Sequence, residues 1–307
     1  MKKFLLNIFA FGVCLLIADK GLVFLRKISP QLEVDKRLEM IVTGKIQSDI
    51  LIFGSSRGAR SVIASQITDS LGRSCYNLSY PGSDITFHEY LLQATLEQKN
   101  NKKPTTAILV VDDGDELKTT PALKFRYDRM FPLVDYKMIR DELVRRNKKK
   151  MFFADILIAH QLNRSNLMLR KKKFTKRDSI TREGSMLIWK QKKTFNYTYK
   201  SEPYIYSKQG ELLWKLKAFN GFVKLCKKNN IELIVAIPPN YRAATDGFKE
   251  RMEEQLNGFG TVFEFDPTIK EYKDDNYFFD NSHLLKRGAH IFTAELSGIL
   301  KDIKKVR

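Results

Sequence analysis

Short apolar runs alternate with amphipathic segments through much of the chain, and this alternation limits its possible folds more than any other feature. Each run is rich in Ile, Leu and Val and stops near a Gly or Pro, which is typical of a buried strand. Strands that alternate with helices predict an α/β fold, with a parallel sheet covered by helices on both faces. The predicted strands are 48–53, 74–78, 106–111, 231–237 and 261–265, and the predicted helices are 57–71, 85–98, 214–228, 248–256 and 284–301.

The N-terminal residues predict a membrane segment. Lys2 and Lys3 precede an apolar run over 4–17, which as a helix spans about 21 Å, less than a hydrocarbon core of about 30 Å. A helix continued to Leu25 reaches about 33 Å. No Ala-x-Ala cleavage site follows the run. We therefore interpret residues 1–27 as an uncleaved signal anchor, in preference to a cleaved signal peptide or a buried core helix. The positive-inside rule then places the two lysines in the cytoplasm and the rest of the chain outside.

The gap between the third and fourth predicted strands is too long for a plain crossover connection. We interpret residues 115–209 as a basic helical insertion, with helices at 136–146 and 152–169. The α/β domain is then made of residues 28–114 and 210–307. The insertion is also rich in aromatic residues, which include Trp189, Phe195, Tyr197, Tyr199, Tyr204 and Tyr206.

The chain carries a large positive charge, with 54 Lys and Arg against 35 Asp and Glu, a formal net charge of +19. Between Lys124 and Lys200 there are 22 basic and 7 acidic residues. This excess favours an anionic partner such as a lipid surface or an acidic polymer, or it forms a solvated basic surface. Because the sequence has no zinc-finger spacing, RNP-like motif or basic region before heptads, we do not expect a nucleic-acid partner. Its three cysteines, Cys14, Cys75 and Cys226, predict neither a disulfide framework nor a metal site.

A serine pair follows the first predicted strand. Gly54 permits a tight turn there, and Ser56 would stand at the N-terminus of the next helix. Free N–H groups at that position can stabilise an oxyanion, so Ser56 is a candidate nucleophile. The alternative is a plain helix cap, since serine is a preferred N-cap residue.

A nucleophilic serine needs a base, and His283 is the best placed of the four histidines. His88 and His290 fall inside predicted helices and His160 falls in the insertion, whereas His283 lies just before the last helix. Asp280 precedes it by three residues, so its carboxylate can fold back and orient the imidazole, as a catalytic triad requires. The alternative is that this segment only caps the helix.

Taken together, these segments resemble the SGNH/GDSL hydrolase family. Ser56 in Gly-Ser-Ser-Arg matches the first family block, with Ser55 in place of the usual Asp. Gly82 matches the second block, whose glycine N–H contributes to the oxyanion hole, and Asp280 and His283 match the last block, Asp-x-x-His. The resemblance implies a three-layer α/β/α, flavodoxin-like fold. It also implies oxyanion or substrate binding by Gly82, Ser55 and Arg57, without cofactor or metal.

The third family block differs in this chain. It normally reads Gly-x-Asn-Asp after the third strand, and its Asn donates to the oxyanion. Here the corresponding segment is Val-Asp-Asp-Gly-Asp over 111–115, which contains no Asn. Because an ionised carboxylate cannot donate a hydrogen bond, we expect the oxyanion hole to rest on the backbone N–H groups of Ser56 and Gly82.

Two functional hypotheses follow. The anchor, the Gly-Ser-Ser opening and the long insertion resemble membrane-tethered cell-envelope members, similar to D-alanyl transfer and alginate O-acetylation proteins. This resemblance implies an extracytoplasmic esterase or O-acyltransferase that acts on acyl esters, acetyl above all, of an anionic polysaccharide, beside a membrane-bound O-acyltransferase. The alternative is a catalytically inactive protein of the same fold that binds glycan or the acyltransferase.

Overall fold

The computed structural model describes residues 1–146, 157–162, 179–192 and 194–305. The chain forms two compact units. The first contains Met1–Val42 and Arg126–Lys173, and the second contains Thr43–Phe125 and Phe174–Arg307. Residues of the expected insertion, 115–209, are therefore shared between the two units.

The second unit is built on a five-stranded sheet. All neighbouring strands are parallel, and their order is β2-β1-β3-β4-β5. The predicted α/β class with a parallel sheet is therefore confirmed, and each predicted strand is present with bounds that differ by at most two residues. The strands are β1 (Ile50–Gly54), β2 (Cys75–Asn77), β3 (Thr106–Val110), β4 (Glu232–Ile237) and β5 (Thr261–Glu264).

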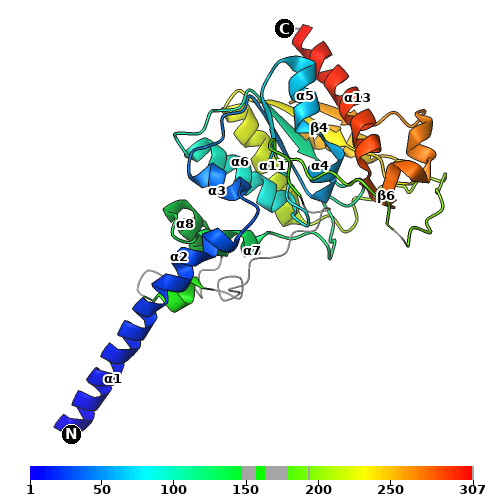
Figure 1. Ribbon diagram of the computed structural model, residues 1–307. Helices are drawn as coiled ribbons and strands as arrows, with labels where there is room; N and C mark the ends of the chain where they lie inside the picture. The colour runs from blue at the N-terminus through cyan, green and yellow to red at the C-terminus, as the bar shows by residue number, and fades with distance from the viewer. Residues whose placement is uncertain (147–156, 163–178, 193, 306–307) are drawn as a thin grey trace. The chain divides into compact units, whose positions relative to one another are not determined.

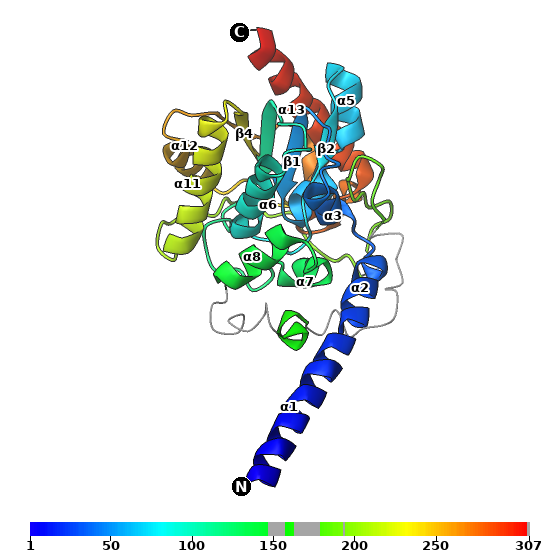
Figure 2. The same cartoon turned by 90° about the vertical axis from the view of Figure 1, so that its left-hand side faces the viewer.

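Helices pack on the sheet in two groups. α5 (Ala64–Leu71) lies beside α13 (Lys286–Lys305), and α6 (Ile85–Glu97) lies beside α11 (Leu213–Lys228), as Figures 1 and 2 show. Successive side chains of β1 pack against the two helix groups in turn, because side chains along a strand point alternately to opposite faces of the sheet. Ile50 and Ile52 join the core cluster that contains α13 residues, while the Phe53 ring packs on Phe222 of α11, with 5.3 Å between ring centroids. The second unit also contains α12 (Phe248–Leu256), η4 (Lys270–Lys273) and η5 (Asp275–Tyr277).

The single helix predicted over 57–71 is wrong, because the structure has two helices there. α4 (Ser56–Ser61) ends at Val62, which is extended like Ile63, and α5 then begins at Ala64. Tertiary partners satisfy the backbone at the break: Thr293 Oγ1 accepts from the Ile63 N–H at 3.0 Å, and Ser185 Oγ donates to the Val62 carbonyl at 2.9 Å. These bonds outweigh local helix propensity, which is only a weak preference.

A short hairpin follows the fifth strand and was not predicted. Antiparallel strands β6 (Phe278–Asp280) and β7 (His283–Leu284) pair Asp280 with His283 across the two residues between them. The hairpin leads directly into α13.

The first unit is helical. Asp19, the one acidic residue of the apolar helix α1, is 8% exposed and accepts from the N–H groups of Ile158 and Ala159, at 2.8 Å each. Within the described residues, one helical stretch, Lys2–Leu32, has the length and apolar composition to cross a membrane. The elements are α1 (Lys2–Gly21), α2 (Val23–Leu32), α3 (Arg37–Val42), α7 (Tyr127–Met130), η1 (Phe131–Leu133), α8 (Lys137–Arg146) and η2 (Ile158–Gln161).

The two helices predicted in the insertion have different outcomes. The helix predicted at 136–146 corresponds to α8. The helix predicted at 152–169 falls mostly outside the described residues, and its described part forms the short 3₁₀ turn η2 rather than an α-helix.

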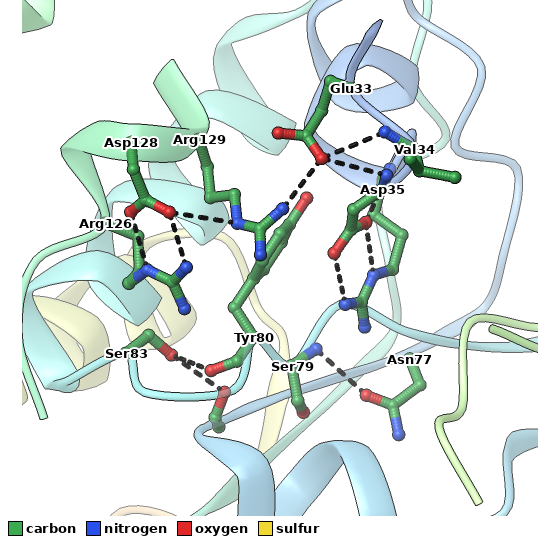
Figure 3. Close-up of polar contacts among 12 residues, drawn as sticks. Glu33, Val34, Asp35, Asn77, Ser79, Tyr80, Ser83, Arg126, Asp128 and Arg129 are labelled. Carbon is green, nitrogen blue, oxygen red and sulfur yellow. Dashed lines mark hydrogen bonds and ion pairs between the residues drawn. The ribbon is translucent and has the colours of Figure 1, made fainter. Parts of the chain in front are cut away.

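Ion pairs and hydrogen bonds hold the first unit's connecting segments (Figure 3). Glu33 Oε1 accepts from Arg129 Nη1 at 2.8 Å and from the Val34 N–H at 3.0 Å. Asp35 binds Arg37 through two hydrogen bonds of 2.6 and 2.9 Å, and the Arg37 side chain is 1% exposed. Such paired geometry is what allows an arginine to be buried.

Candidate active site

The nucleophile candidate stands where β1 passes into α4. Gly54 is required at this junction, because a Cβ there would lie 2.7 Å from the Val110 carbonyl oxygen of β3. Ser55 is the N-cap of α4, and its Oγ accepts from the Arg57 N–H at 3.2 Å. The capping role therefore falls to Ser55, which leaves Ser56 at the first position of the helix.

His283 lies within hydrogen-bond reach of Ser56. The distance from His283 Nε2 to Ser56 Oγ is 2.8 Å, and His283 Nδ1 lies 2.8 and 3.0 Å from the two Asp280 oxygens. With Nδ1–H donating to Asp280, Nε2 is free to accept the serine proton, which is the arrangement of a catalytic triad. Thus the structure brings together Ser56, Asp280 and His283.

The hairpin fixes the acid relative to the base. Asp280 Oδ1 accepts from the backbone N–H groups of Ser282 and His283, both at 3.0 Å. This local turn is typical of aspartate, whose short side chain reaches the N–H groups that follow it. It explains why a spacing of three residues places the carboxylate against the imidazole.

Electrostatics keep the pair in the states that base catalysis needs. Burial alone would raise the pKa of Asp280, but hydrogen bonds from His283 and Ser282 outweigh it and hold that pKa well below its usual range. Burial lowers the pKa of His283, although Asp280 opposes this effect. Asp280 is therefore ionised and His283 neutral at pH 7. Their side chains are 18% and 17% exposed, so solvent reaches both.

Arg57 joins α4, which begins at Ser56, to the β6–β7 hairpin, which contains His283. Its side chain is buried, and its guanidinium donates to the backbone carbonyl of Ser282, to Asn240 Oδ1 and to the carbonyl of Pro238 after β4. Sequence analysis placed Arg57 among the oxyanion- or substrate-binding residues, whereas these partners are all parts of the protein. The structure therefore shows Arg57 connecting α4, the end of β4 and the hairpin.

Gly82 occupies a tight turn beside the end of β1. The Ser83 N–H donates to the Tyr80 carbonyl at 3.1 Å, with Pro81 between them and Gly82 at φ +74°. A type II turn requires this positive φ, which favours glycine. The Tyr80 N–H donates to the Gly54 carbonyl at 2.9 Å, which ties the turn to the strand before Ser56. The role of the Gly82 N–H in an oxyanion hole remains a prediction.

Carboxyl groups occupy the loop after β3. Asp112 Oδ2 accepts from Ser55 Oγ at 2.6 Å, and Glu116 Oε2 accepts from the Asp112 N–H at 2.9 Å. Burial raises the pKa of Asp112 although Arg57 opposes this, and burial with the nearby Asp112 raises the pKa of Glu116 to about 8. The Ser55 hydroxyl is thus engaged by Asp112 and by the helix cap.

Asn240 is a site residue that sequence analysis missed. Its Oδ1 accepts from Arg57, and its Nδ2 donates to Asp113 Oδ2 at 3.3 Å. The signal was its place just after β4, because the carboxyl ends of parallel strands meet at one edge of a sheet. Among the described residues, no group of three or more His, Cys, Asp or Glu could hold a metal ion.

Comparison with protein-family models finds no match, and no curated protein sequence matches the chain. The geometry of the site therefore carries the functional argument.

Proposed function

We propose that this protein is a membrane-tethered serine esterase or O-acyltransferase that acts on acyl esters of a cell-envelope polysaccharide. The observation that carries the proposal is the contact of 2.8 Å between His283 Nε2 and Ser56 Oγ, with Asp280 bound to the other ring nitrogen. A serine bonded to an oriented, neutral imidazole is the arrangement that activates a hydroxyl for attack on a carbonyl.

The reaction would proceed in two balanced halves. In the first, Ser56 Oγ attacks the ester carbonyl while its proton passes to His283 Nε2. The tetrahedral adduct then collapses, the alcohol leaves with that proton, and the acyl group stays on Ser56. In the second half, water or a sugar hydroxyl attacks the acyl-serine while His283 accepts its proton. The bond between the acyl carbon and Ser56 Oγ then breaks, the acyl group leaves as the free acid or as the new sugar ester, and His283 returns the proton to Ser56. We assign oxyanion stabilisation to the N–H groups of Ser56 and Gly82.

The finer fold assignment is also a proposal. We infer a three-layer, flavodoxin-like SGNH arrangement, which is supported by the strand order β2-β1-β3-β4-β5 and by Ser56 at the end of β1. In such sheets ligands bind where the strand order reverses, here between β1 and β3. We also infer that Lys2–Leu32 anchors the chain with its N-terminus in the cytoplasm, with the site outside beside a membrane-bound O-acyltransferase.

Hydrolysis of p-nitrophenyl acetate by the full chain in detergent tests this proposal. We expect wild-type turnover, and we expect Ser56→Ala to lose about 10⁴-fold or more, because serine and base act as one unit. Ser207→Ala, an exposed serine in the same unit, is the matched control. Equal rates for Ser56→Ala and wild type would contradict the proposal.

A second candidate is a glycan- or acyltransferase-binding protein without turnover. The loop after β3 favours it, because the segment 111–115 has no Asn where the family has an amide donor, and Asp112 already binds Ser55. A chain that resists a fluorophosphonate label on Ser56 while binding an anionic glycan would support this alternative.

A further inference from the structure

Two segments beside the hairpin lie next to each other. Residues 194–206 run along the loop 240–246 that follows β4, and backbone hydrogen bonds of 2.8 Å link them, from the Ala243 N–H to the Lys200 carbonyl and from the Asp246 N–H to the Tyr204 carbonyl. We call these two segments the tyrosine rim. The rim reaches the catalytic hairpin directly, because the Tyr241 N–H donates to the Asn281 carbonyl at 3.0 Å.

The rings of the rim are fixed by one another. Tyr241 packs edge-on against Phe195 and Tyr199, with centroids 5.6 Å apart in each pair, and it also contacts Phe278 of β6 at 5.1 Å. Phe195 in turn holds Tyr197 at 5.2 Å. Side chains held in this way lose little rotamer freedom when a ligand binds.

Two rings present their surfaces to solvent. Tyr197 is 37% exposed and Tyr204 is 49% exposed. Cations lie beside Tyr204: the Arg242 guanidinium carbon lies 4.6 Å from its ring centroid, and Lys200 Nζ lies 3.2 Å from its hydroxyl. Arg242 Nη2 also lies 3.5 Å from Asp113 Oδ2, so the rim joins the loop after β3 as well as the hairpin.

We propose that the tyrosine rim is a binding subsite for a carboxylate-bearing glycan chain, a proposal that rests on the esterase function above and names its substrate surface. A sugar ring has an apolar C–H face and a polar edge, and a tyrosine offers an apolar face with a polar tip to match it. Arg242 and Lys200 supply donors for a carboxylate at the edge of that ring.

The charges of the rim favour a glycan over a nucleic acid. Its two basic residues, Lys200 and Arg242, are balanced by two acidic ones, Glu202 and Asp246. A duplex presents one negative charge about every 1.7 Å, and proteins bind such backbones with excess positive charge. Such sparse positive charge instead fits a polymer whose carboxylates are a sugar ring apart.

Binding to the full-length Ser56→Ala chain in detergent tests this inference without turnover. The probe is a fluorescein-labelled polygalacturonate oligosaccharide followed by anisotropy, with neutral dextran and single-stranded poly-dT as competitors. We expect Tyr204→Leu to weaken binding about tenfold, as expected for loss of a ring face beside cations, and Tyr204→Phe to stay within about twofold. Arg242→Gln should also weaken binding, and Lys208→Gln, which changes an exposed lysine outside the two rim segments that pairs with Glu254, is the charge-matched control.

Tyr197→Leu is a second variant, for the case in which a change at Arg242 disturbs the loop 240–246. Tyr197 lies at the exposed end of the ring cluster, in the other rim segment, and its loss should also weaken binding. The inference is overturned if both leucine variants bind the polyuronate like the parent chain. It is also overturned if poly-dT binds more tightly with the same dependence on Tyr204. Polyuronate binding through the rim without ester hydrolysis would support the inference and contradict the esterase, whereas hydrolysis without rim-dependent binding would do the reverse.

Discussion

Asp280 ends β6 of the hairpin and Asp112 follows β3 of the sheet, and both interact electrostatically with His283. Asp280 accepts hydrogen bonds from the imidazole, the Ser282 and His283 N–H groups and the Ser282 hydroxyl, and these lower its pKa. The side chain of Asp112 accepts one bond, from Ser55, and burial raises its pKa. The number of hydrogen bonds that each carboxyl group accepts thus decides whether its pKa is lowered or raised, since both groups are aspartates.

Exchange of each carboxylate for its amide gives the largest expected contrast. Asp280→Asn should lower kcat for p-nitrophenyl acetate about 10⁴-fold, because an amide favours the wrong imidazole tautomer. Asp112→Asn should cost less than about tenfold, because it keeps an acceptor for Ser55 and can donate to an oxyanion as well. Equal losses in the two variants, measured by steady-state kinetics, would remove the distinction between the two groups.

Arg57 offers the next largest effect. Arg57→Met should lower kcat about 10²-fold, because the hairpin loses the bond that holds it against the nucleophile helix. The charge of Arg57 also lowers the pKa of His283, so the acidic limb of the pH–kcat profile should move to higher pH. Arg57→Lys keeps the charge and should leave that limb in place while recovering part of kcat. A lower kcat with an unshifted limb in Arg57→Met would assign Arg57 a purely structural role.

The wild-type pH profile tests the base itself. His283 acts as a base only when neutral, and burial lowers its pKa from the ordinary 6.5. Therefore kcat/KM should rise with pH to a plateau, with a midpoint below 6.5, and Asp280 should add no second limb because its pKa is lower still. A midpoint above 6.5 would mean that Asp280 dominates over burial.

Glu116 gives the smallest effect, on stability. Its pKa is raised from 4.5 to about 8, so its contribution is fully present below pH 4.5 and is lost as the pH rises through about 8. Glu116→Gln should therefore raise Tm relative to wild type by about 2–4 °C at high pH, and less at low pH. A Tm difference that does not change between pH 5 and pH 9 would contradict this assignment.

The sequence predicted most of the sheet because buried parallel strands are continuous apolar runs, which need no knowledge of their neighbours. It did not predict the break at Val62 and Ile63, because the bonds that stabilise it come from Ser185 and Thr293, far along the chain. The hairpin was missed for a related reason, since its strands are too short for periodicity to show.

In the candidate site, too, the features set by local sequence were predicted and those set by distant residues were not. Ser56, Asp280 and His283 were identified from local context, because a turn after a strand and a spacing of three residues are visible in one dimension. The connection made by Arg57 was not visible, since its partners Asn240 and Ser282 are distant in sequence. Long-range hydrogen bonds of this kind depend on strand order, which apolar runs do not encode.

The separation of 227 residues between Ser56 and His283 has a consequence for biosynthesis. A nascent chain that has emerged as far as β5 already contains the serine but lacks its base. The hairpin and α13, which contacts both α4 and β7, complete the site only after all five strands of the sheet have been translated. If the proposed function holds, the protein is therefore synthesised, and exported in the proposed topology, without an activated nucleophile until the hairpin and α13 have docked.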